Sequence, residues 1–181
     1  MRLTTASVVA ALGLMMAPMT LPSAQLAWAQ DAAAPAAKTV APGSLTPDQV
    51  KADQAVWKSA DCASCHGWSG NGKDTGPIPP GPSLRETQLE YTDIRETIAC
   101  GRPGTSMPSH DRLAWSVHAC YGMKAADVGH QKPQKGIALT DDKIDAIAEY
   151  VAGYLKGRGP TSKAECEAYY SPGDAKCSSY P

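Results

Sequence analysis

The pattern of apolar and polar positions predicts three helices, of which the last is the clearest. It begins at Thr140, which two acidic residues follow at the positive end of the helix, and it ends at Gly157. Its apolar stripe, at helical spacing, consists of Ile144, Ile147, Val151 and Leu155. The first helix has an equally clear start in Thr46-Pro47-Asp48 and carries Val50 and Trp57 on one side.

The second helix is shorter and spans 92–101, with Thr92 as its N-cap and Gly101 just past its end. Residues 67–85, before it, are rich in glycine and proline, which excludes a helix or a central strand. A rigid loop around a large flat ligand would suit this composition. No run of residues alternates as a strand would, so we predict an all-α fold for residues 46–157.

The residues before this domain are predicted to lie outside it. Residues 1–29 have a basic start, an apolar run and Ala27-Trp28-Ala29, which together are typical of a cleaved secretory signal peptide. A retained membrane anchor is the alternative, but the unbroken apolar run is well short of the roughly 20 residues that span a bilayer. Residues 30–45 are Ala/Pro-rich and are predicted to be a disordered leader. We therefore expect a protein exported to the periplasm, with no stable membrane insertion.

Cys62-Ala63-Ser64-Cys65-His66 carries the candidate chemistry, because C-x-x-C-H is the pattern of covalent haem attachment. On a helical turn both thiols and the imidazole share one face, so the thiols can form thioethers while the imidazole ligates iron. A redox dithiol would sit near a βαβ pattern, which is lacking, and a zinc site would need a second ligand pair. We expect one covalent haem c.

Two further segments follow in the order of a known family. With the haem motif, Gly81-Pro82-Ser83-Leu84 and the run 101–108 (Gly-Arg-Pro-Gly-Thr-Ser-Met-Pro) resemble the class I mono-haem c-type cytochromes over residues 46–157. The resemblance implies that the first and last helices cross, with Tyr150 or Tyr154 at the contact. It also implies that the Pro82 carbonyl accepts the Nδ1–H of His66, which fixes the tautomer.

The resemblance implies a thioether as the second axial ligand. Without the signal peptide, only Met107 and Met123 remain. Met107 lies between two prolines in a turn-rich loop and is the preferred ligand. Met123 is the weaker methionine, and the remaining alternatives are His110, His118 and His130. Iron held by His66 and Met107 would be six-coordinate and would have no open site for a substrate.

Four cysteines remain after haem attachment, an even number that suits an oxidising compartment. They allow three pairings, of which we favour Cys100–Cys120 and Cys166–Cys177 because each closes a short loop. The first pair falls partly within an insertion, 109–139, that the compact family pattern lacks. The insertion would form an ordered flap beside Met107. Residues 158–181 would form a tail that the second disulfide fastens to the domain.

Charge narrows the possible partners. Without Arg2, 16 basic and 18 acidic side chains remain, a formal charge of −2, and there is no basic footprint for nucleic acid. The resemblance implies a monomeric, non-enzymatic one-electron carrier between a dehydrogenase or quinol-oxidising complex and a terminal oxidase or reductase. One alternative is a peroxidase-like or ligand-sensing protein with a displaceable methionine. The other is a dedicated electron-accepting subunit of a quinoprotein alcohol dehydrogenase. The added flap and tail give the chain a weak resemblance to the cytochromes that serve such enzymes.

Overall fold

The computed structural model describes residues 38–73, 75 and 78–181, so the predicted signal peptide and the first part of the leader lie outside the described residues. In chain order the elements are α1 (Pro47–Ser59), α2 (Ala63–His66), α3 (Tyr91–Cys100), β1 (Ser109–Asp111), α4 (Ala125–Val128), the 3-10 turn η1 (Gly129–Gln131), β2 (Lys135–Leu139), α5 (Asp141–Glu149), the π-helical η2 (Tyr150–Leu155), α6 (Lys163–Tyr169) and the 3-10 turn η3 (Ala175–Cys177). In this part of the chain, no helix has both the length and the apolar character needed to cross a bilayer.

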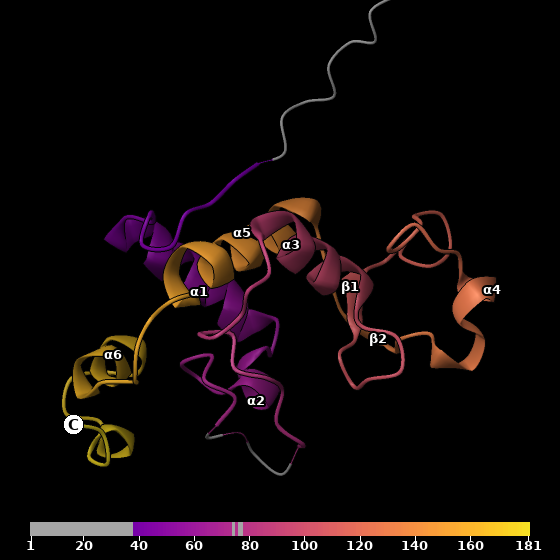
Figure 1. The fold of residues 1–181 in the computed structure, drawn as a ribbon. Helices are drawn as coiled ribbons and strands as arrows, with labels where there is room; N and C mark the ends of the chain where they lie inside the picture. The colour runs from indigo at the N-terminus through magenta and orange to yellow at the C-terminus, as the bar shows by residue number, and fades with distance from the viewer. Residues whose placement is uncertain (1–37, 74, 76–77) are drawn as a thin grey trace, which may run out of the picture. The chain divides into compact units, whose positions relative to one another are not determined.

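Helix α5 is the centre of the core and packs against both α1 and α3 (Figure 1). Helix α1 begins in a capping box, in which the hydroxyl of Thr46 accepts from the amide of Gln49. Near its end Trp57 is buried and its ring centroid lies 5.7 Å from that of Tyr150. Gln54 also donates to the Tyr150 hydroxyl at 3.2 Å, so the expected contact between first and last helices is confirmed at Tyr150.

The start of α3 and the end of the last helix differ from the sequence predictions. Helix α3 starts at Tyr91 with Glu90 as its N-cap, so the prediction of Thr92 was wrong. Tyr91 is drawn into the helix because its buried ring places the hydroxyl 3.0 Å from the Asp145 carboxylate on α5. Helix α1 stops at Ser59, two residues before the haem motif.

The last helix was predicted to be regular up to Gly157, but its final part, η2, is π-helical. The amide of Gly43 donates to the carbonyl of Gly153 at 2.7 Å, so the leader bonds one of the last carbonyls of the helix, which have no partner within the helix itself. Gly153 is needed there because a Cβ would lie 2.8 Å from Leu45. The end of the leader therefore packs on the domain, which corrects its prediction as disordered up to residue 45.

The fold is not purely α-helical, which corrects the predicted class. Strands β1 and β2 pair in parallel, with Ser109 opposite Lys135 and Asp111 opposite Leu139. They join the two ends of the insertion, whose backbone groups would otherwise lack partners. At three and five residues the strands are too short to produce a clear alternating pattern.

The tail is more regular than predicted, since it contains α6 and η3, and it is part of the same compact unit as the preceding domain. The Cys166–Cys177 disulfide is present and joins these two elements. Arg85 is buried between the tail and the rest of the domain, where it donates to the Gly159 carbonyl at 2.6 Å and pairs with Glu165 at 3.2 Å. The disulfide therefore crosslinks the tail internally and does not fasten it to the domain, which corrects the prediction, whereas the buried ion pair between Arg85 and Glu165 does fasten it.

Candidate cofactor site

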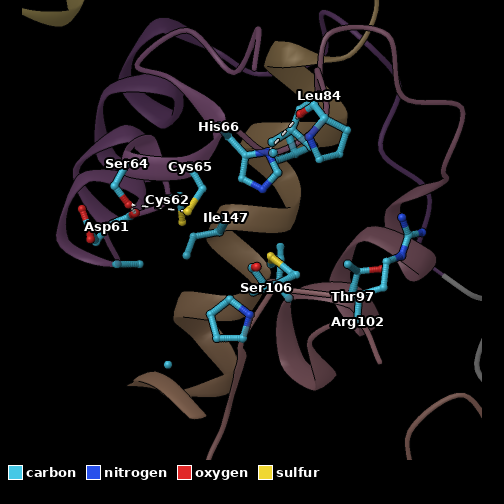
Figure 2. A pocket seen from close by; sticks show the side chains of 18 of the residues that line it. Asp61, Cys62, Ser64, Cys65, His66, Leu84, Thr97, Arg102, Ser106 and Ile147 are labelled. Atoms are coloured by element: carbon cyan, nitrogen blue, oxygen red, sulfur yellow. Dashed lines mark hydrogen bonds between the residues drawn. The ribbon is translucent and has the colours of Figure 1, made fainter. Parts of the chain in front are cut away.

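Helix α2 is a single turn that begins just after Cys62 and ends at His66. The amide of His66 donates to the carbonyl of Cys62 at 3.0 Å, and this bond closes the turn. Figure 2 shows Cys62, Cys65 and His66 on the same side of the turn, with their side chains directed into one cavity, and Ser106 and Ile147 on other parts of its wall. The helical spacing in the sequence therefore produces a convergent group of two thiols and one imidazole.

The cavity has a volume of about 840 Å³ and a mainly apolar lining. It lies between the loop that follows α2, the helices α3 and α5, and the segment from residue 102 to residue 110. Ile94 and Ile98 on α3 line it, as do Met107 and four residues of the haem motif, Cys62, Ser64, Cys65 and His66. A mainly apolar space with a few convergent polar groups is typical of a cofactor site.

The imidazole of His66 is held by the loop that passes beside it. Its Nδ1–H donates to the carbonyl of Pro82 at 3.0 Å, the hydrogen bond that the resemblance implied. Burial lowers the pKa of His66, while the bond to Pro82 opposes this shift to a smaller extent. The ring is therefore neutral, with its lone pair on Nε2. Gly81 allows the close approach, because a Cβ there would lie 2.7 Å from Cε1 of His66.

The two thiols of the motif differ from a redox pair. Cys62 and Cys65 are the two cysteines outside the disulfides. Burial, with a smaller contribution from the nearby Asp61, raises the pKa of the Cys62 thiol to about 12. Reactive dithiols have a lowered thiol pKa, so this environment argues against thioredoxin-like chemistry. Among the described residues, no group of three or more His, Cys, Asp or Glu side chains is placed so that it could hold a metal ion by itself.

Met107 reaches the cavity from a tight loop on its other side. The amide of Arg102 donates to the carbonyl of Met107 at 3.1 Å, and the amide of Met107 donates to the Thr105 hydroxyl at 3.2 Å. Gly101, with φ of +67°, starts the loop, and a Cβ there would lie 2.6 Å from the Pro108 backbone. Met107 is half-buried, and Thr105 and Ser106 beside it are exposed.

The flap fastens this loop from behind. The Cys100–Cys120 disulfide is present, as the sequence analysis favoured. Trp115 is buried and its Nε1–H donates to the Cys100 carbonyl at 2.7 Å, while the Tyr121 hydroxyl donates to the Gly101 carbonyl at 2.7 Å. The insertion is therefore an ordered support for the segment that leads to Met107.

Of the other candidate ligands, three lie outside the cavity and one lines it. Met123, His118 and His130 do not line the cavity. His118 and His130 are exposed, and Nδ1 of His118 lies 2.6 Å from the Asp111 carboxylate. His110 does line the cavity and is buried, which the sequence pattern around it did not indicate.

Two side chains outside the predicted set also belong to the site. Arg102 lines the cavity, so its guanidinium is placed where it could pair with a haem propionate, whereas Arg112 does not line the cavity. Trp57 also lines the cavity, and its buried Nε1–H has no hydrogen-bond partner among the described residues. A buried donor without a partner is costly, so this group fits a site that receives a ligand with acceptor atoms.

These features define a class of protein, a small helical domain with a preformed apolar cavity for a covalently held, iron-binding cofactor. The family model described as cytochrome c matches residues 50–154, more than half of the chain, and the chain belongs to this family. Members bind covalently attached haem c, and the cavity fits it, since both unpaired thiols, a neutral imidazole and a thioether line one space. No curated protein and no solved structure matches the chain.

Proposed function

We propose that the protein is an exported one-electron carrier. In this proposal Cys62 and Cys65 hold haem c by thioether bonds, and His66 and Met107 are the axial ligands. The observation that supports it best is that all four side chains line one cavity, with Nε2 of His66 left free by the bond from Nδ1 to Pro82. Haem-based electron transfer is the function of the family, and the export and ligand assignments extend it to this chain.

When bound, the haem would supply a one-electron couple at its iron. The protein would set the reduction potential of this couple and would leave no open position at which the iron could bind a substrate. His66 and Met107 would both ligate the iron when the haem is bound, and the soft sulfur of Met107 would favour the ferrous state and raise the reduction potential. The apolar lining from Ile94 and Ile98 keeps water away from the cofactor.

Partners would approach the mouth of the cavity. Ile78 and Ile137 line the cavity and are exposed, and Thr105 and Ser106 lie exposed beside Met107. An apolar, accessible mouth suits brief contacts with redox proteins. We propose a dehydrogenase or quinol-oxidising complex as the electron donor and a terminal oxidase or reductase as the acceptor, in the periplasm.

Purification of the exported protein tests the proposal. We expect a mature N-terminus near Gln30, a mass increased by one haem, a low-spin ferric spectrum with the weak far-red thioether-to-iron band, and reversible reduction by one electron. A Cys62→Ala/Cys65→Ala variant should lose covalent haem. A colourless product, or one that carries zinc, would contradict the proposal.

A peroxidase-like or ligand-sensing function is the second candidate, and the exposure of the residues beside Met107 favours it. It predicts that cyanide binds the ferric protein within seconds and that peroxide is turned over. The carrier predicts slow cyanide binding, limited by loss of the methionine. Rates of reduction by a quinoprotein alcohol dehydrogenase and by a quinol-oxidising complex would test whether the carrier serves one dedicated donor.

A further inference from the structure

His110 is a second imidazole in the wall of the cavity. It belongs to β1, three residues after Met107, and only 6% of its surface is exposed. Its ring lies against the backbone of β2, since a Cβ on Gly136 would be 2.9 Å from Cε1 of His110 and 3.0 Å from Cγ of Pro108. Because Gly136 leaves this space open, the imidazole sits within the fold and lines the same cavity as Met107.

The hydrogen bonding of His110 repeats that of His66. Nδ1 of His110 donates to the carbonyl of Ile137 at 2.8 Å, as Nδ1 of His66 donates to the carbonyl of Pro82 at 3.0 Å. In both rings the proton is therefore on Nδ1 and the lone pair on Nε2. A carbonyl that holds one imidazole nitrogen in this way is the usual partner of a metal-ligating histidine. No described residue bonds Nε2 of His110.

The two far-side groups differ in how firmly they are held. His110 is buried on a paired strand, whereas Met107 is half-buried in a loop next to exposed Thr105 and Ser106. Small rearrangements of this loop would therefore move the thioether before they moved the imidazole. Ferric iron also has a weaker preference for a soft thioether than ferrous iron has.

We propose that His110 is a reserve axial ligand, which takes the far-side position on the iron through Nε2 when the thioether of Met107 is absent. This inference rests on the proposed function, because it requires haem c on Cys62 and Cys65. It gives the carrier a second low-spin state with two imidazole ligands and a lower potential, in place of an open, reactive iron. The far side of the cavity then contains two alternative ligands three residues apart.

The test compares holoprotein variants in the ferric state. Met107→Ala should lose the far-red thioether band yet stay low-spin, with the electron paramagnetic resonance signature of two imidazoles. Met107→Ala/His110→Asn should become high-spin, although Asn retains an amide donor for the Ile137 carbonyl. Met107→Ala/His118→Asn is the matched control and should resemble Met107→Ala, because His118 is exposed and does not line the cavity.

Added imidazole gives a quantitative reading. If His110 occupies the iron in about nine-tenths of Met107→Ala molecules, removal of His110 should strengthen imidazole binding about tenfold. If Met107→Ala/His110→Asn does not fold with haem, Met107→Ala/His110→Gln replaces it. A high-spin Met107→Ala protein that binds imidazole as tightly as the double variant would overturn the inference.

The wild-type spectrum separates this inference from the proposed function. A thioether band in wild type together with high-spin Met107→Ala leaves the carrier intact and removes only the role of His110. A wild type without that band, which becomes high-spin on His110→Asn, would make His110 the resident ligand and refute both the reserve role and the assignment of Met107. A protein without covalent haem would refute the proposed function itself.

Discussion

The two walls of the cavity are supported in different ways. The near wall (residues 62–72 and 81–85) carries the haem motif and is fastened by the tail. The far wall (residues 101–110) carries Met107 and His110 and is fastened by the flap. Each support contains one disulfide, but the tail adds a buried ion pair and an aromatic cluster. The imidazole side is thus held more firmly than the thioether side.

The aromatic cluster of Trp68, Tyr169 and Tyr180 shows how close the tail comes to His66. Trp68, two residues after His66, is buried, and its Nε1–H donates to the Tyr180 hydroxyl at 3.0 Å. Its ring centroid lies 5.5 Å from that of Tyr169. Lys58, which precedes the haem motif in sequence, donates to the Tyr169 carbonyl at 2.6 Å. The tail therefore reaches both flanks of the haem motif, outside the residues that the family model matches.

The far wall leaves more freedom. Its flap contributes two hydrogen bonds from Trp115 and Tyr121 to backbone carbonyls, and its loop is exposed at Thr105 and Ser106. From this difference we expect His66, on the rigid near wall, to stay bound to the iron. We expect Met107, on the more adaptable far wall, to be exchangeable. Four predictions, each with its own variants, test the comparison.

The largest effect is expected for Arg85→Leu in the near wall. It would leave the buried Glu165 carboxylate with only Arg158 and the Ser162 amide as partners, and the loss of the buried ion pair should cost about 3–5 kcal/mol of the free energy of unfolding. Urea denaturation measures this cost. Arg112→Leu, an exposed arginine of the flap, should change stability by less than about 0.5 kcal/mol. Equal losses for the two variants would contradict a specific role of the tail.

Removal of either disulfide is expected to cost about 3 kcal/mol, because the loops of 11 and 20 residues that they close are similar in entropy. The spectra should differ. Cys100→Ala/Cys120→Ala loosens the far wall and should weaken the thioether band, whereas Cys166→Ala/Cys177→Ala should leave it intact. Thermal denaturation with parallel absorption spectra measures both. If the tail variant lost the band and the flap variant kept it, the assignment of supports to walls would be wrong.

Gly81→Ala should disturb the near-side ligand with a smaller loss of stability, about 1–3 kcal/mol, because its Cβ would overlap the His66 ring at 2.7 Å. The bond between His66 and Pro82 should be strained, and the reduction potential should shift. Gly159→Ala is the matched control, since nothing lies within 4 Å of its Cβ. Voltammetry of both variants measures the reduction potential. An unchanged potential in Gly81→Ala would show that the loop does not position His66.

The smallest effect concerns Asp53 on α1, which neither wall contains. Burial, and then the charge of Glu149, raise the pKa of Asp53 from 3.8 to about 6, and its buried Oδ2 has no hydrogen-bond partner within the part of the chain that the structure describes. The folded state therefore binds the proton more tightly than the unfolded state, so stability falls as pH rises from about 4 to about 6. Asp53→Asn should add about 1 kcal/mol or less at pH 7.5, after allowance for solvent screening, and nothing at pH 4.

Melting curves at the two pH values measure this difference. The thioether band should not change in Asp53→Asn, because the substitution touches neither wall. A gain at pH 4 as large as that at pH 7.5 would exclude titration of Asp53 as its cause.

What the sequence determined by itself was local. The convergence of Cys62, Cys65 and His66 follows from the 3.6-residue period of one helical turn, and the start of α1 follows from the cap at Thr46. The short loops closed by the favoured cysteine pairs were also visible along the chain. Each of these features depends on residues close together in sequence, so its physics can be evaluated without a fold.

What only the tertiary structure decided depends on distant residues. The pairing of β1 with β2 places His110 against Gly136, 26 positions further along the chain, and so builds a second imidazole into the cavity wall. The ion pair between Arg85 and Glu165 likewise joins segments that no local period relates. Burial and hydrogen bonding across such separations arise only when the chain has folded, and they set the environment of the cavity walls that carry His66 and Met107.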